Sequence, residues 1–197
     1  YFNQPSITKW NLARFAECLV PLINEDKDKA IDIATETINT FETKYEKKWL
    51  NMMRDKLGLF GEDAKDEVLI LDLLTWMHQN KADYTNTFCH LMEFKIKEEN
   101  IYNNLNFKNW EKRLKERQLK NNTSYNKSLE LMKKNNPLII PRNHRVEEIL
   151  KSAENGDLKP FIKFLNVLIE PYNEHKNLTY YQSLIGYKEN YQTFCGT

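Results

Sequence analysis

Glycine and proline are scarce in this chain of 197 residues, which contains only five Gly and six Pro. All-β folds need many tight turns, and these two residues form most of them, so the scarcity argues against an all-β fold. No run approaches the ~18–20 apolar residues of a membrane span, and no signal peptide opens the chain. The remaining composition, 41% hydrophobic and 29% charged, is that of a globular protein without membrane association.

Cysteine is also rare, and charge of one sign is not in excess. Cys18, Cys89 and Cys195 lie far apart and are odd in number, so they form no disulfide framework and favour a cytoplasmic location. We expect Cys18 and Cys89 to be small apolar core residues. The net charge is +1 from 29 basic and 28 acidic residues, which gives no basic stripe for nucleic-acid binding.

Apolar residues recur at spacings of three and four along most of the chain, which predicts an all-α fold, an irregular multi-helix bundle. The expected helices cover residues 5–23, 28–57, 63–79, 83–98, 107–120, 125–134, 143–153 and 157–168. The third is apolar on nearly all sides, which is typical of a central helix. Pro21 should end or kink the first.

Local signals mark where these helices begin and end. Gly58 is predicted to be a C-cap, and Asn143 an N-cap. The segment from Pro137 to Pro141 must be extended because a residue before proline avoids the helical region. Signals weaken after Pro171, so we expect one helical domain over residues 1–175 and a tail over residues 176–197. Because the chain begins at Tyr1 with a helical pattern, we expect further chain upstream.

A search for a catalytic centre finds none. The pair Gly58 and Gly61 does not match any phosphate-binding loop. The four His are scattered, and Cys89 and His90 are adjacent in sequence, so metal-ligand spacing is absent. The stretch from His144 to Glu147 lacks the Asp that a kinase catalytic loop requires, since Val146 stands in its place.

Several short motifs nevertheless occur together and in order. They are Asn3-Gln4-Pro5, Trp10 to Arg14, Ala82 to Phe88, Asn136-Pro137, Ile140 to Glu148, Gly156-Asp157, Pro160-Phe161, Pro171-Tyr172 and Phe194 to Thr197. This set resembles the C-terminal part of the selenoprotein O family, in its bacterial cysteine-containing form.

The resemblance implies a protein adenylyltransferase with a kinase-like (pseudokinase) fold. Such an enzyme uses ATP and Mg²⁺ or Mn²⁺ to transfer AMP to Ser, Thr or Tyr hydroxyls of proteins. The family's catalytic and nucleotide-binding residues precede the segment seen here. The chain alone is therefore expected to be non-catalytic, to form the helical C-terminal part of the kinase-like C-lobe, and to have the upstream lobe and protein substrates as partners. The alternative is a free-standing helical module that binds a partner protein and has no enzymatic activity.

The resemblance also singles out individual residues. Cys195 matches by position the redox-sensitive selenocysteine or cysteine near the family's C-terminus, which bridges to the kinase-like core; an inert terminal thiol is the alternative. Five further motif residues have two readings. They are Asp83, Asn86, Arg142, His144 and Arg145. In one reading Asp83 caps a helix and the basic residues hold the extended proline segment against the bundle. In the other they face a substrate or the nucleotide-binding lobe.

Overall fold

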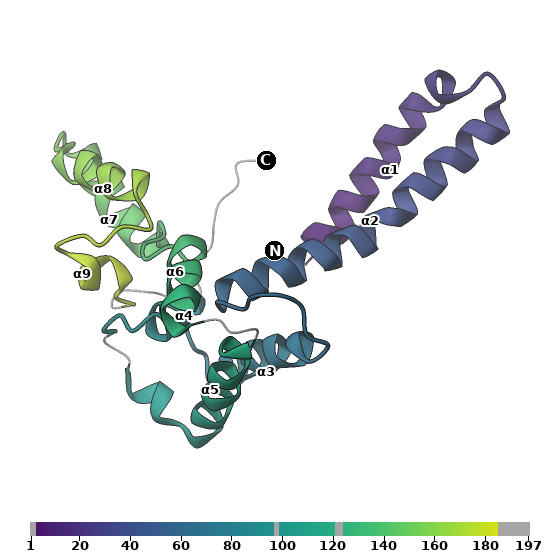
Figure 1. The fold of residues 1–197 in the computed structure, drawn as a ribbon. Helices are drawn as coiled ribbons and strands as arrows, with labels where there is room; N and C mark the ends of the chain where they lie inside the picture. The colour runs from purple at the N-terminus through teal and green to yellow at the C-terminus, as the bar shows by residue number, and fades with distance from the viewer. Residues whose placement is uncertain (1–2, 97–98, 121–123, 185–197) are drawn as a thin grey trace. The chain divides into compact units, whose positions relative to one another are not determined.

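The computed structural model describes residues 3–96, 99–120 and 124–184. In these ranges the chain forms nine α-helices, one 3-10 helix and no strand, so the all-α prediction is confirmed (Figure 1). The contacts divide the chain into two compact units, Tyr1–Met52 and Met53–Thr197. Within the described ranges, none of the helices combines the length and the apolar character needed to cross a membrane.

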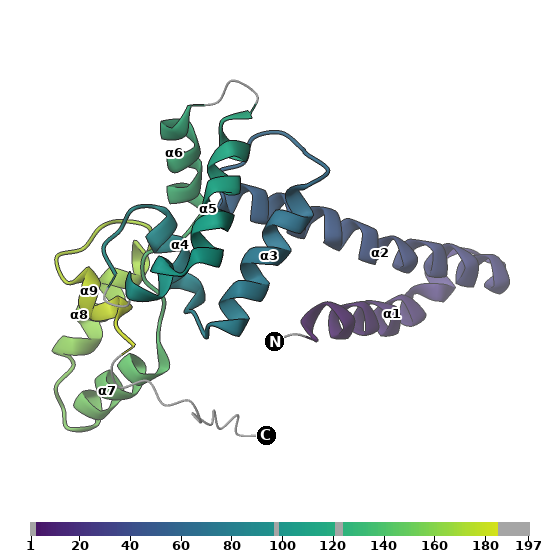
Figure 2. The ribbon, with the colours of Figure 1, turned by 90° about the horizontal axis from the view of Figure 1, so that it is seen from below.

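Unit 1 is a hairpin of two helices that run side by side in both ribbon views (Figures 1 and 2). They are α1 (Gln4–Ile23) and α2 (Lys27–Lys56), and the last turn of α2 belongs to unit 2. The helix α1 ends two residues after Pro21, in agreement with the predicted termination. The Asp26 carboxylate accepts hydrogen bonds from the first backbone N–H groups of α2 and thereby begins that helix.

Unit 2 contains the remaining elements. They are α3 (Asp66–Gln79), α4 (Tyr84–Leu91), the 3-10 helix η1 (Glu99–Asn103), α5 (Leu105–Gln118), α6 (Tyr125–Asn135), α7 (Asn143–Glu154), α8 (Lys159–Ile169) and α9 (Leu178–Gln182). The helices α3 and α5 pack against each other, as do α7 and α8 (Figure 2).

Three local predictions are wrong. The helix expected over residues 83–98 ends at Leu91, because the backbone turns at Glu93 with a φ of 67°. Arg142, and not Asn143, occupies the N-cap position of α7. In the described residues α3 is covered on one face only, since Val68 and Leu71 are exposed on the other.

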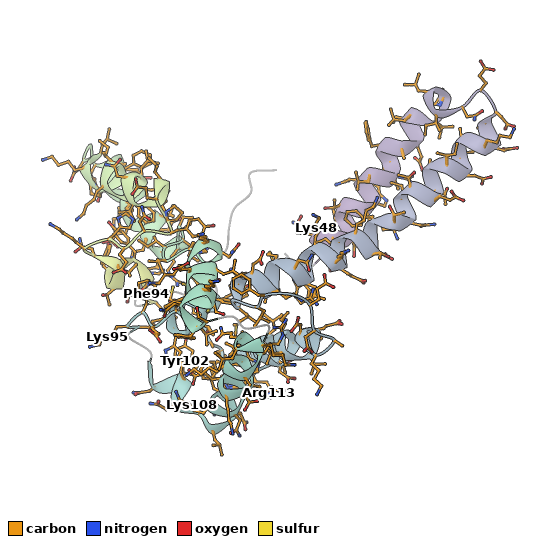
Figure 3. The ribbon with its side chains drawn as sticks, in the orientation of Figure 1. Lys48, Phe94, Lys95, Tyr102, Lys108 and Arg113 are labelled. Atoms are coloured by element: carbon orange, nitrogen blue, oxygen red, sulfur yellow. The ribbon has the colours of Figure 1, made fainter. Side chains whose placement is uncertain are left out.

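Aromatic side chains form the core between α3, η1 and α5. The Phe107 ring centroid lies 4.5 Å from that of Trp76 and 5.2 Å from that of Tyr102, which is labelled in Figure 3. Trp110 is buried and its indole N–H donates to the Leu69 carbonyl at 2.8 Å, which satisfies the polar atom of a large apolar side chain. These rings account for the packing of α5 on α3.

The C-terminus of α2 ends in a Schellman motif. The N–H of Leu59 donates to the Arg54 carbonyl, and the N–H of Gly58 donates to the Asp55 carbonyl. Gly58 has a φ of 68°, and a Cβ at this position would lie 2.6 Å from the Ser128 carbonyl oxygen of α6. Both the backbone conformation and the close approach of α6 therefore require glycine, which confirms the predicted C-cap.

A buried carboxylate joins the end of α2 to α3 and α5. The Asp66 side chain is fully buried and accepts from Arg54 Nε at 2.7 Å and from Arg117 Nε at 2.6 Å. Burial alone would raise the pKa of Asp66, but the hydrogen bonds from Arg117 and Arg54 outweigh it and hold this pKa below its usual value. Asp66 is therefore ionised at neutral pH.

We predict that Gly58→Ala destabilises the protein more than Gly156→Ala. Both glycines have positive φ, but a Cβ at Gly156 has nothing within 4 Å. An alanine at positive φ is strained, which lowers the free energy of unfolding by about 1 kcal/mol at Gly156. At Gly58 the contact of the added Cβ with α6 raises this loss to about 2 kcal/mol or more. Urea unfolding of both variants measures the difference. Equal losses would contradict the close approach of α6 to the end of α2.

A second prediction concerns Asp66→Asn, which leaves two buried guanidinium groups without their carboxylate. We expect a loss of about 3–5 kcal/mol at neutral pH. Because the folded pKa is depressed, the stability from Asp66 is present above about pH 4 and is lost as the pH falls through the folded pKa. The wild-type protein should therefore lose more stability on acidification than the variant does. Unfolding curves at several pH values test this, and parallel losses in the two proteins would refute it.

Candidate functional site

An arginine and a carboxylate form the centre of the cluster of motif residues. Asp83 is the N-cap of α4, where its side chain accepts from the Asn86 N–H at 2.8 Å. Arg142, at the N-cap of α7, donates from two nitrogens to the two Asp83 carboxylate oxygens, each at 2.8 Å. Arg142 also donates to the Asn86 side-chain oxygen at 3.0 Å. The predicted cap at Asp83 is confirmed, and the bidentate pair joins α4 to α7.

The short helix α9 lies against this centre. The buried Asn86 side chain donates to the Gln182 carbonyl at 3.1 Å. The Gln182 side chain donates in turn to the Leu138 carbonyl at 3.1 Å and contacts the Cys89 sulfur at 3.4 Å. Tyr181 of α9 stacks on Phe164 of α8 with ring centroids 5.5 Å apart. The end of α9 is thus held from several elements at once.

His144 and Arg145, in the first turn of α7, contact Ser183 and Tyr180 in and just after α9. The His144 Nε2 atom lies 3.1 Å from the Ser183 carbonyl. Burial and the neighbouring Arg145 lower the pKa of His144, so the ring is neutral at pH 7 and its Nε2–H tautomer donates to that carbonyl. Arg145 donates to the Tyr180 carbonyl at 3.2 Å, and its guanidinium lies 3.9 Å from the centroid of the Tyr180 ring.

All five motif residues therefore meet around one segment. We call this cluster, made of Asp83, Asn86, Arg142, His144 and Arg145, the clasp; it holds residues 180–183. Its side chains contact backbone carbonyls and one another, which is the pattern of a structural network. Gln182 completes it and was missed by the sequence analysis, because a single Gln in a weakly patterned region carries no signal. A role of these residues towards a substrate stays a prediction.

The cysteines have different environments. Cys89 is buried beside the clasp, and burial raises the pKa of its thiol to about 12, so it is not a nucleophile at neutral pH. Cys18 is exposed on α1, so its prediction as a core residue is wrong in this chain. Cys195 lies outside the described residues, and its redox role stays a prediction.

The described residues offer no cluster of metal ligands. Among them no group of three or more His, Cys, Asp or Glu side chains is placed to hold a metal ion. The carboxylates of Asp66 and Asp83 already accept from arginine side chains, and a cation would have to displace these donors. We therefore derive no chemical step from this cluster.

Comparison with known proteins gives a family match over most of the chain. The model of the family described as "Protein adenylyltransferase SelO" matches residues 1–169. A protein nucleotidyltransferase YdiU from Pelagibacter ubique is 51% identical over 198 residues, which is all of this chain and 41% of that protein. Its counterparts from Nitrosococcus oceani and Alcanivorax borkumensis are 46% and 44% identical over 199 residues, which is 40% and 41% of those proteins. The chain thus spans about 40% of the length of these relatives.

For the clasp we predict that Arg142→Lys destabilises the protein by about 2 kcal/mol or more, since lysine cannot form the bidentate pair and leaves buried acceptors unsatisfied. The matched control is Arg113→Lys, because Arg113 pairs with Asp72 at the exposed surface and should change stability by less than about 0.5 kcal/mol. Urea unfolding measures both, and hydrogen exchange should show faster exchange at residues 180–183 only in the first variant. Unchanged exchange there would rule out the clasp as the anchor of this segment.

Proposed function

Because this chain belongs to the family of the protein adenylyltransferase SelO, we propose that it is the C-terminal helical region of an ATP-dependent enzyme that attaches AMP to proteins. In the proposed reaction a Ser, Thr or Tyr hydroxyl of a protein substrate attacks the α-phosphorus of ATP. A phosphodiester bond forms, pyrophosphate leaves, and the hydroxyl proton is released. The single observation that carries the proposal is the family match over residues 1–169.

The relatives support the reaction class. Those compared above are named protein nucleotidyltransferases, and each is matched over the whole of this chain. The motif resemblance points to the same family independently of overall identity, because it rests on short polar and proline-containing segments. Adenylyl transfer with Mg²⁺ or Mn²⁺ is the finer assignment that we propose for the full-length protein.

Within that protein we assign this chain a structural part. The polar residues of the clasp hold one another and residues 180–183, and Asp66 is held by Arg54 and Arg117. We therefore assign ATP, the metal ion and the reacting groups to the portion of the full-length protein that lies outside these 197 residues. The free thiols of Cys18 and Cys89 support a cytoplasmic location.

The test compares the full-length protein with the chain alone. Each is incubated with Mg²⁺ or Mn²⁺, a bacterial protein extract and ATP labelled at the α-phosphate. We expect label on protein with the full-length protein and none with residues 1–197. ATP labelled at the γ-phosphate is the control, because adenylyl transfer leaves it unincorporated while a kinase would transfer it. Incorporation of only the γ-label, or of neither, would refute the proposed activity.

A further inference from the structure

The helix α1 carries very little charge for a helix at a protein surface. Of its 20 residues only Lys9, Arg14 and Glu17 are charged. Lys9 pairs with Glu42 of α2 at 2.8 Å, and Arg14 pairs with Glu17 at 2.6 Å. Each charge on α1 thus has a partner of opposite sign inside unit 1, so the helix can be covered without leaving an isolated buried charge.

The face of α1 that points away from α2 is exposed and mostly apolar, with the polar residue Asn11 among its apolar side chains. The side that faces α2 carries small residues such as Ala13 and Ala16, which line a groove between the two helices. The opposite side carries Ile7, Phe15 and Leu22, which are 51%, 61% and 82% exposed. No described residue of α1 is buried, and the side chains project freely from the hairpin (Figure 3).

The exposed apolar residues also extend round the helix. At 100° per residue, the positions from Trp10 through Leu22 to Leu12 cover roughly 200° of the circumference, with the polar residues Thr8, Asn11 and Arg14 interspersed among them. A surface helix has an apolar stripe of roughly 100°, whereas a helix that is apolar on most sides is internal. One partner helix would cover only part of such an arc, so α1 has the character of a helix surrounded by several elements.

The outer face of α2 has the opposite character. The residues that point away from α1, such as Asp32, Glu36, Thr43 and Lys47, are exposed and mostly polar, although Ile33 beside them is 45% exposed. The hairpin therefore has one mostly apolar outer face, on α1, and one mostly polar outer face, on α2. This asymmetry indicates that unit 1 packs against protein on one side and faces water on the other.

We propose that the outer face of α1 is the docking surface for the part of the full-length protein that this chain does not include, which makes α1 an internal helix of the enzyme. The inference rests on the proposed function for the existence of that part. Its size supports it: the relatives are about two and a half times as long as this chain, so about 60% of their length is available to surround α1. A second copy of the chain is the competing occupant.

The sharpest test uses Cys18, which lies on the outer face of α1 and is exposed in this chain. The full-length protein is treated with a thiol reagent, and modification of the peptide that contains Cys18 is followed by mass spectrometry. The control is Thr43→Cys on the outer face of α2. We expect Cys18 to react at least 100-fold more slowly than the control cysteine. Rates within about threefold of each other would overturn the proposal.

Two further measurements identify the occupant. If protection of Cys18 disappears on dilution to a monomer, a second copy covers α1 and the proposal is wrong. In the full-length monomer, Leu22→Glu should lower the melting temperature by about 5 °C or more, and Lys47→Glu by about 1 °C or less. Equal shifts would count against docking at α1. The labelled-ATP assay on the same samples separates the two proposals. If Cys18 is protected but no AMP is transferred, the docking surface stands and only the proposed activity is refuted.

Discussion

The arrangement of unit 2 depends on how the helix α2 ends. A helix terminus leaves carbonyl groups without partners inside the helix, and burying them unpaired costs about 1–3 kcal/mol each. Here the Gln118 side chain of α5 donates to the Leu57 carbonyl, and Asn136, after α6, donates to the Lys56 carbonyl. The turn at Gly58 brings α6 into contact, and Arg54 holds Asp66 of α3. Three helices are thus positioned by contacts to one helix end.

The clasp solves a different problem, which is how to hold a very short helix. The five residues of α9 are too few to form a stable helix by themselves or to bury much apolar surface. Hydrogen bonds from Asn86, His144 and Arg145 to carbonyl groups of residues 180–183 take the place of a larger core. This explains why two of the most recognisable motifs of the sequence, around Asp83 and around Arg142, are rich in polar residues.

The two units differ in how much of their own apolar surface they bury. Unit 2 buries an aromatic core between α3, η1 and α5, whereas α1 in unit 1 keeps most of its apolar side chains exposed. The exposed apolar side chains of α1 form the docking surface that we propose for the rest of the full-length protein, since the chain spans about 40% of the length of its relatives.

The sequence by itself determined the elements: the helical class, most helix positions, the C-cap at Gly58, the N-cap at Asp83 and the family. The elements and caps depend on neighbours within about four residues, where periodicity and capping preferences act, whereas the family follows from motifs along the whole chain. Only the tertiary structure decided which polar residues pair, because Asp83 meets Arg142 from 59 residues away and Asp66 meets Arg117 from 51 residues away. It also decided that α4 stops at Leu91 and that Cys18 is exposed. A local pattern sets the type of an element, whereas the partner of a side chain depends on the path of the whole chain.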